Sequence, residues 1–391
     1  MYKIKTYNQI STKGLERFSR DHYEVASDIG HPDAFLLRSH KLHHEILPDT
    51  VKAVARAGAG VNNIPVETYT QQGVVVFNTP GANANAVKEL VLAGLLLGSR
   101  GILSGMNYAQ SLAPTDDAAV MHKQLEAEKK RFAGFELRGK TLGVVGLGAI
   151  GSMVADMALA LGMNVLGYDP ALSVDAAWRL PSQVQRMENL QSLLSHADFI
   201  SLHVPAIEQT HHLINKDTLA SVKPEAVLLN FARDSIVDPL AIVASINNHH
   251  LGQYICDFPE PCLLNHERII AMPHIGASTR EAEENCAVMA ADQLIDYLDN
   301  GNIKNAVNFP AIAMARAGRC RLTFSNRNVA GVLGQVLSVF TEYQVNVVDM
   351  VNKSRNDIAY NIIDLEQLPS DKALAEIDRL APVIRARLLV V

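Results

Sequence analysis

Four apolar stretches of this sequence end in side chains that can bind anions or carry protons. Phe199–Pro205 contains His203, Ala226–Asn230 is followed by Arg233, Tyr254–Asp257 leads to Glu260, and Ile269–His274 ends in a histidine. Imidazole exchanges protons near neutral pH, and a guanidinium binds a carboxylate through two hydrogen bonds. The length and β-branched content of these stretches are typical of buried strands. Because the carboxyl ends of parallel strands meet at one edge of a sheet, we expect these side chains to share one cleft.

A second pattern, Thr141–Asp169, has the order of a dinucleotide-binding unit: strand, glycine turn, helix, strand and acid. Gly146 permits the tight turn, Gly148 lets a pyrophosphate approach the backbone, and Gly151 lets helix and strand pack closely. An ordinary glycine turn in an α/β protein is the alternative. The acid at the end of the second strand favours the cofactor interpretation.

The helix after the glycine turn begins at Ala149 and Ile150, whose N–H groups would bind the diphosphate at the positive end of the helix dipole. Asp169 would accept hydrogen bonds from the ribose hydroxyls, and Pro170 rather than an arginine follows it. Since a carboxylate repels a 2′-phosphate, the sequence predicts NAD and not NADP.

The composition excludes several function classes. The chain has 391 residues, 48% of them hydrophobic, and a net charge of −6, which gives no broad electrostatic reason to bind nucleic acid. The longest nearly apolar run, Val91–Gly98, is too short to cross a bilayer, and the N-terminus lacks the apolar core of a signal peptide. The four cysteines form no CxxC pair and have no histidine cluster at zinc spacing. We therefore expect a cytoplasmic protein with reduced thiols, no metal, and no nucleic-acid or membrane partner.

Strand and helix signals alternate along the rest of the chain. The alternation over Met1 to Pro80 predicts a small parallel α/β unit. The apolar helix expected over Ala82–Arg100 would contact another domain or subunit. A polar segment from about Pro114 to Lys130 leads to the glycine fingerprint, which interrupts this unit. The amphipathic helix expected over Arg280–Asn300 would return the chain to it.

The last stretch, Gly318–Val391, has the order strand, helix, strand, strand, helix, strand, which is typical of a ferredoxin-like domain. The sequence thus predicts an α/β fold with a Rossmann-like, doubly wound NAD domain over residues 85–274. That domain is inserted into a flavodoxin-like substrate domain of residues 1–84 and 275–312, and a regulatory domain over 318–391 follows.

Six segments carry a resemblance to a known family. They are GAGVNNIPVE (Gly58–Glu67), VVVFNTPGANANAVKELV (Val74–Val91), LRGKTLGVVGLGAIG (Leu137–Gly151), LHVP (Leu202–Pro205), NFAR (Asn230–Arg233) and MPHIGAST (Met272–Thr279). In this order they resemble the D-isomer-specific 2-hydroxyacid dehydrogenases, most closely those members that act on D-3-phosphoglycerate and carry a C-terminal ACT domain. The resemblance implies NAD-dependent oxidation of D-3-phosphoglycerate to 3-phosphohydroxypyruvate, the first step of phosphorylated L-serine biosynthesis.

The resemblance also implies catalytic roles. His274 matches the acid/base that takes the hydroxyl proton, and Glu260 is expected to be the carboxylate that hydrogen-bonds it, with Glu267 as the alternative. A neighbouring carboxylate favours the protonated imidazole, which suits proton donation in the reverse direction. Arg233 matches the arginine that binds the substrate carboxylate and polarises the carbonyl.

Other positions match the family's binding residues. On the cofactor side, Pro205 matches a cofactor-binding position, and Asp257 is similar to the acid that holds the nicotinamide amide. The substrate-binding matches are Arg38 and Ser39 near the phosphate, Ala59 and Gly60 in the loop around the carboxylate, and Asn83 as a polar substrate-side residue.

For the C-terminal domain the resemblance implies an L-serine site at a domain interface, with Asn326, Asn328 and Asn346 as polar ligands. Asparagines at strand and helix ends are also common in turns and caps, so a structural role is the alternative. The apolar helix and the ACT domain edge suggest a homodimer or homotetramer.

Two other functions stay open from the sequence. One is a hydroxypyruvate, glyoxylate or 2-oxoglutarate reductase of the same family. Arg38 argues against it, since a phosphate needs cationic partners. The other is an NAD-sensing, corepressor-like binding protein. The pair of Arg233 and His274 argues against that, because a sensor has no need of an acid/base.

Overall fold

The computed structural model describes residues 1–112, 117–178 and 180–390 of the chain. They form two compact units: Met1–Asn83 together with Arg280–Val391, and Ala84–Thr279. The predicted α/β fold is confirmed, while the predicted domain boundaries stay predictions. Among the described residues, no helix has both the length and the apolar character needed to cross a bilayer.

The first unit contains a parallel sheet with strand order β2-β1-β3-β4-β5. Its strands are β1 (Tyr2–Thr6), β2 (Tyr23–Ala26), β3 (Ala34–Leu37), β4 (Ala53–Arg56) and β5 (Val75–Phe77), and its helices are α1 (Thr12–Leu15), α2 (Val66–Gln71) and α11 (Arg280–Asn300). β3 and most of β4 are buried, as expected for central strands covered on both faces.

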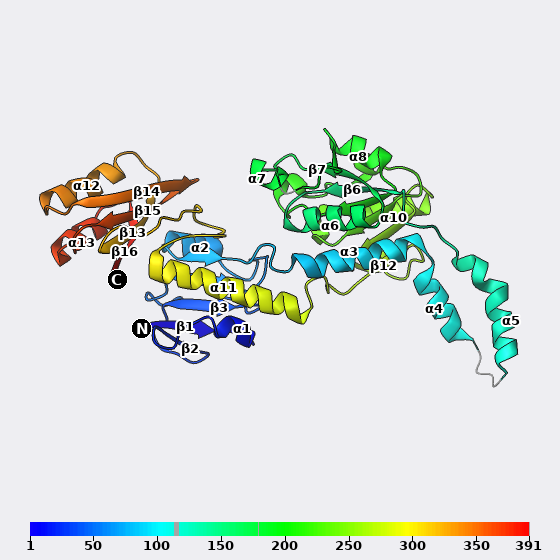
Figure 1. Cartoon of the computed structure of the whole chain (residues 1–391), viewed down its shortest axis with the longest axis horizontal. Helices are drawn as coiled ribbons and strands as arrows, with labels where there is room; N and C mark the ends of the chain where they lie inside the picture. The colour runs from blue at the N-terminus through cyan, green and yellow to red at the C-terminus, as the bar shows by residue number, and fades with distance from the viewer. Residues whose placement is uncertain (113–116, 179, 391) are drawn as a thin grey trace. The chain divides into compact units, whose positions relative to one another are not determined.

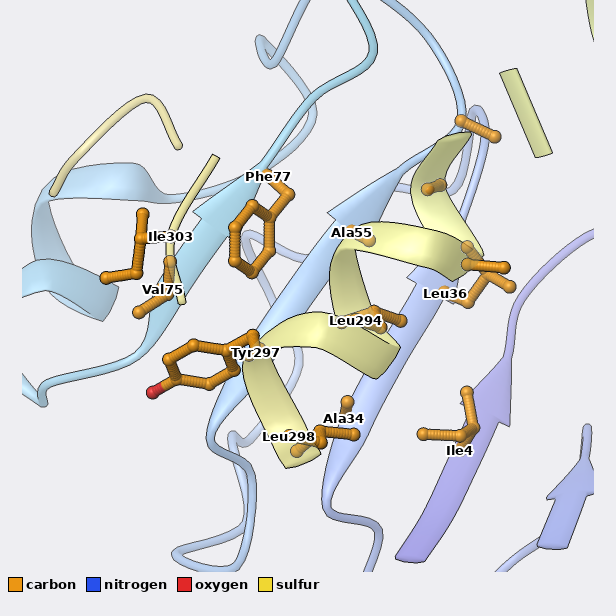
Figure 2. Packing of buried hydrophobic residues seen from close by; sticks show 14 of the residues in the cluster. Ile4, Ala34, Leu36, Ala55, Val75, Phe77, Leu294, Tyr297, Leu298 and Ile303 are labelled. Atoms are coloured by element: carbon orange, nitrogen blue, oxygen red, sulfur yellow. The ribbon is translucent and has the colours of Figure 1, made fainter. Parts of the chain in front are cut away.

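Helix α11 covers one face of this sheet and joins the two sequence halves of the unit (Figure 1). In Figure 2, Leu294, Tyr297 and Leu298 of α11 face strand residues such as Leu36 and Phe77. All five side chains are at most 2% exposed. This apolar contact packs the helix against the sheet that carries the predicted substrate-binding loops.

The second unit contains a longer parallel sheet with strand order β12-β11-β10-β9-β6-β7-β8. Its strands are β6 (Thr141–Val145), β7 (Asn164–Tyr168), β8 (Gln185–Arg186), β9 (Phe199–Leu202), β10 (Val227–Asn230), β11 (Gln253–Cys256) and β12 (Ile269–Ala271). Its helices are α3 (Ala84–Ser99), α4 (Ile102–Ser111), α5 (Ala118–Glu128), α6 (Ala149–Ala160), α7 (Val174–Ala177), α8 (Leu190–His196), α9 (Lys216–Leu219) and α10 (Pro239–Asn247). Short 3-10 turns are η1 (Lys129–Phe132), η2 (Glu208–Thr210), η3 (Asp234–Ile236) and η4 (Pro261–Leu263). From β6 the chain adds β7 and β8 on one side and then β9 to β12 on the other. The reversal between β6 and β9 is the switch point at which α/β sheets bind ligands.

The polar segment expected from about Pro114 to Lys130 contains helix α5, although Pro114 itself lies outside the described residues. Asp117 caps the helix by accepting hydrogen bonds from Ala119 and Val120 at 2.9 and 3.4 Å. No residue of α5 is buried, so no apolar stripe marks it in the sequence.

The C-terminal residues form an antiparallel sheet with strand order β14-β15-β13-β16. The elements are β13 (Cys320–Arg327), α12 (Val332–Glu342), β14 (Val347–Arg355), β15 (Ile358–Leu365), α13 (Asp371–Asp378) and β16 (Val383–Val390), in the ferredoxin-like order that the sequence predicts. Helices α12 and α13 pack together over one face (Figure 1).

The other face of that sheet belongs to the core of the first unit. Arg321, fully buried, forms a bidentate ion pair with Asp364 at 2.6 and 2.9 Å. It also donates to the carbonyl of Asn300, the last residue of α11, at 2.9 Å. The Tyr360 hydroxyl donates to the Gly301 carbonyl at 3.0 Å. The antiparallel sheet is therefore fixed to the end of α11.

Candidate active site

The glycine turn between β6 and α6 has the geometry that each glycine requires. Gly146 has a φ of 92°, in the left-handed region, and a Cβ there would lie 2.8 Å from the His203 backbone. A Cβ on Gly151 would lie 1.9 Å from the Gly146 carbonyl oxygen. A Cβ on Gly148 would have no atom within 4 Å, which leaves open space beside the turn. The turn thus packs tightly on the protein side and stays open on the side where a pyrophosphate would bind.

Helix α6 starts with Ala149 and Ile150, and its N-cap residue Gly148 has no side chain to accept from the first-turn N–H groups. Such unpaired N–H groups, with the positive end of the helix dipole, favour an anion. The residues present therefore fit the diphosphate of NAD.

Asp169 is fixed at the end of β7. Its Oδ2 accepts from the Leu147 N–H at 2.9 Å and its Oδ1 from the Ala171 N–H at 2.9 Å. Each carboxylate oxygen keeps acceptor capacity, so ribose hydroxyls can still bind. Asp169 lines a cavity of about 840 Å³ together with Pro170 and Arg186. The cavity is large enough for an adenosine. Arg186 in its wall was not among the cofactor-binding residues predicted from the sequence.

Arg233 follows β10 and is positioned by buried Asn230. The Asn230 amide donates to the Arg233 carbonyl at 2.8 Å, and its oxygen accepts from the Ala232 N–H at 3.1 Å. One guanidinium N–H of the half-buried Arg233 donates to the Ala232 carbonyl at 2.6 Å. A guanidinium has five N–H donors, so a fork for a carboxylate is retained.

His274 lies in a loop that buried Asp257 holds. The Asp257 carboxylate, 2% exposed, accepts from the N–H groups of Ile275 at 2.8 Å and Gly276 at 2.6 Å. His274 has a φ of 59°, its side chain is exposed, and its ring centroid lies 4.9 Å from that of Phe258. Asp257 thus acts on the backbone next to His274, whether or not it also contacts the cofactor.

The structure does not bring Glu260 or Glu267 into contact with His274. Over the described residues, neither carboxylate forms an ion pair or hydrogen bond with that imidazole. Glu260 precedes η4. Burial and the neighbouring Cys256 raise the pKa of Tyr254 above its ordinary value, and the charge of Glu260 adds to this rise. The identity of the histidine's acidic partner remains a prediction.

His203 is not available as a second acid/base. Its Nε2 lies 2.8 Å from the Ser201 hydroxyl, and burial lowers the pKa of His203 to about 3. The ring is therefore neutral at physiological pH. Pro205, two residues on, accepts at its carbonyl from the Thr210 hydroxyl at 2.5 Å.

In the first unit, the predicted phosphate residues follow β3. The Arg38 guanidinium forms an ion pair with Glu283 of α11 at 2.8 Å. The carboxamide oxygen of Asn8 accepts from the N–H groups of Ser39 at 3.1 Å and His40 at 2.8 Å, which fixes the exposed Ser39 loop.

The predicted carboxylate loop follows β4. The Asn78 amide donates to the Ala59 carbonyl at 2.6 Å, and Arg56 donates to the Gly60 carbonyl. The Asn78 carbonyl in turn accepts from Gln293 of α11 at 3.1 Å. Asn83 is the last residue before α3, and its side chain is half-buried.

In the C-terminal sheet, each predicted effector residue has a partner within the chain. Asn326 is buried, and its oxygen accepts from the Asn361 amide at 2.7 Å. The Asn328 amide donates to a backbone carbonyl, that of Asn356, at 3.2 Å, and the Asn346 amide donates to the Glu366 carboxylate at 2.8 Å. An effector would bind by adding to these bonds or by replacing them.

Several side chains that shape the site were not predicted as site residues from the sequence. They are Asn8, Asn78, Asn230, Phe258 and Glu283. Most of them touch backbone atoms of a predicted site residue, and such a contact follows from the fold and not from residue spacing. Only Asn230 could have been found, as the polar residue that ends an otherwise apolar strand.

Comparisons with known proteins agree with this geometry. Residues 106–276 match the family described as D-isomer specific 2-hydroxyacid dehydrogenase, NAD binding domain. D-3-phosphoglycerate dehydrogenase of Escherichia coli (strain K12) is 33% identical over 343 residues, which cover 84% of this chain and 79% of that protein. The chain belongs to the D-isomer specific 2-hydroxyacid dehydrogenase family.

Other members of the family differ in length. D-3-phosphoglycerate dehydrogenase of Methanocaldococcus jannaschii is 32% identical over 337 residues, 84% of this chain but only 61% of that protein. A crystal structure of NAD+-bound 3-phosphoglycerate dehydrogenase from Entamoeba histolytica has a TM-score of 0.61 at 26% identity and covers 78% of this chain and 98% of that chain. Together with the glycine turn, the match to the family's NAD-binding domain establishes NAD as the cofactor of the second unit.

Proposed function

We propose that this protein catalyses the NAD-dependent oxidation of D-3-phosphoglycerate to 3-phosphohydroxypyruvate, the first step of phosphorylated L-serine biosynthesis. The observation that carries the proposal is that Arg233 and His274 follow β10 and β12 of the sheet that carries the glycine turn, and that a buried polar side chain holds the backbone at each of them. The similarity to curated D-3-phosphoglycerate dehydrogenases supports the choice of substrate.

His274 takes the proton of the substrate's C2 hydroxyl, and Arg233 binds the carboxylate and polarises the carbonyl that forms. NAD supplies the hydride acceptor when it is bound. The exposed imidazole of His274 can pass its proton to water, whereas the half-buried His203 ring, whose pKa burial lowers to about 3, is a much weaker base. Glu260 would stabilise the protonated imidazole once the two side chains meet.

The substrate's two anionic ends need separate partners. Arg38 and Ser39 would bind the phosphate, since a phosphate is best bound by charge-assisted hydrogen bonds. The N–H groups at Ala59 and Gly60 would bind the carboxylate. Asn83 would contact the part of the substrate that lies between its phosphate and its carboxylate. The anchoring of both loops by asparagine side chains supports this assignment.

A panel of substrates tests the proposal. NADH formation should be faster with 3-phosphoglycerate than with D-glycerate or D-2-hydroxyglutarate, and His274→Asn should abolish turnover while NADH still binds. A wide preference for an unphosphorylated substrate would identify a hydroxypyruvate, glyoxylate or 2-oxoglutarate reductase instead. NADH binding without turnover of any substrate would indicate a binding protein.

The C-terminal sheet is proposed to be an ACT domain that binds L-serine through Asn326, Asn328 and Asn346, in a homodimer or homotetramer of the cytoplasm. Its ferredoxin-like strand order supports the domain assignment. If serine inhibits the enzyme, Asn346→Ala should raise the serine concentration needed for half inhibition. Absence of inhibition in the unmodified protein would remove the effector from the proposal.

A further inference from the structure

Arg38, the proposed phosphate ligand, is paired with an acidic side chain. Its guanidinium Nη1 lies 2.8 Å from the Glu283 carboxylate, which belongs to the first turn of α11. The Arg38 and Glu283 side chains are 41% and 44% exposed, so solvent and small anions reach both. A substrate phosphate that approaches Arg38 therefore meets this carboxylate.

The Arg38 backbone is fixed, so only its side chain can change partner. The Arg38 carbonyl accepts from Arg56 Nε at 2.9 Å and from the Asn63 amide at 3.2 Å. Cys286, one turn of α11 after Glu283, is buried. Burial raises the pKa of the Cys286 thiol, the charges of Arg38 and Arg56 lower it, and that of Glu283 raises it. Two cations and one carboxylate thus act on the Cys286 thiol.

The pair is weak enough for a phosphate to replace it. An exposed ion pair contributes little to stability, because both groups are well solvated when apart. A phosphate dianion offers Arg38 a stronger, charge-assisted partner. The freed Glu283 carboxylate would then remain beside the bound dianion, and like charges at such a distance repel.

We infer that Glu283 competes with the substrate phosphate for Arg38 and thereby lowers the preference of this site for phosphorylated 2-hydroxy acids. The inference rests on the proposed function, since it assigns the phosphate to Arg38. Glu283 is thus a specificity-determining residue. It holds the guanidinium in place when no phosphate is bound and weakens the binding of the phosphate that displaces it.

Glu283→Gln removes the charge and keeps the shape. The ratio of kcat/KM for 3-phosphoglycerate to that for D-glycerate should rise about 2- to 5-fold, which is the scale of a partly screened charge contact. Inorganic phosphate, tested as a competitive inhibitor, should bind more tightly by a similar factor. Glu281→Gln, an exposed neighbour in the same helical turn, is the matched control and should alter neither quantity.

An unchanged or lower ratio in Glu283→Gln would overturn the inference, because the carboxylate would then orient Arg38 for the substrate. Failure of the proposed function looks different. In that case the unmodified protein itself would not use 3-phosphoglycerate in preference to D-glycerate, and Arg38→Met would not weaken inhibition by inorganic phosphate.

Discussion

The position of His274 depends on Asp257, so Asp257→Asn should reduce turnover without weakening cofactor binding. The two Asp257 oxygens accept from the N–H groups of Ile275 and Gly276 at 2.8 and 2.6 Å, directly after His274. An asparagine keeps one acceptor and turns an NH2 group toward the other N–H. A hydrogen bond to a charged group contributes about 1.5–3 kcal/mol.

That loss is large enough to displace the loop in most molecules. Since about 1.4 kcal/mol corresponds to a factor of ten in rate, kcat should fall roughly 10- to 100-fold. Steady-state kinetics with varied NAD measure kcat and KM, and a fluorescence titration measures NADH binding. Asp156→Asn, at an exposed position on α6, is the control.

The alternative for Asp257 makes the opposite prediction. If its main role is to hold the nicotinamide amide, KM for NAD and the Kd for NADH should rise strongly in Asp257→Asn. A kcat within twofold of the unmodified protein would refute the positioning role.

Three further changes test other parts of the structure. Gly151→Ala places a methyl group 1.9 Å from the Gly146 carbonyl oxygen, so NADH affinity should fall more than tenfold in a fluorescence titration. Arg321→Met leaves the Asp364 carboxylate buried without its partner and should destabilise the protein by about 3–5 kcal/mol, seen as a lower melting temperature. Although burial opposes it, hydrogen bonds from Arg321 and Ala317 lower the pKa of Asp364 below the ordinary 3.8. The stability that this carboxylate contributes is therefore present above pH 3.8 and should be lost as the pH falls below that value, in urea unfolding at stepped pH.

Periodicity predicts the elements that bury a continuous apolar face. The helix expected over Arg280–Asn300 has those bounds in the structure. Helix α5 was missed because none of its residues is buried and its main signal is the cap at Asp117.

The residues of the candidate site also fall into those that the sequence predicts and those that it does not. Residues within motifs, such as Gly146, Arg233 and His274, are identified from the sequence because their chemistry and spacing are local. Other site residues are held by contacts between distant parts of the sequence: Asn78 and Ala59 meet across neighbouring strands, and Arg38 meets Glu283 of α11. Pairings of this kind arise from the packing of α11 on the first sheet, which residue spacing does not encode.

In the proposed reaction, Arg233 and His274 serve the oxidation of a phosphorylated 2-hydroxy acid by NAD. The most direct test is the initial rate of NADH formation by the unmodified protein with 3-phosphoglycerate and with D-glycerate, beside His274→Asn. We predict rapid NADH formation with 3-phosphoglycerate, a much lower rate with D-glycerate, and none above background in the variant. Equal rates with both substrates, or unaltered turnover in His274→Asn, would contradict it.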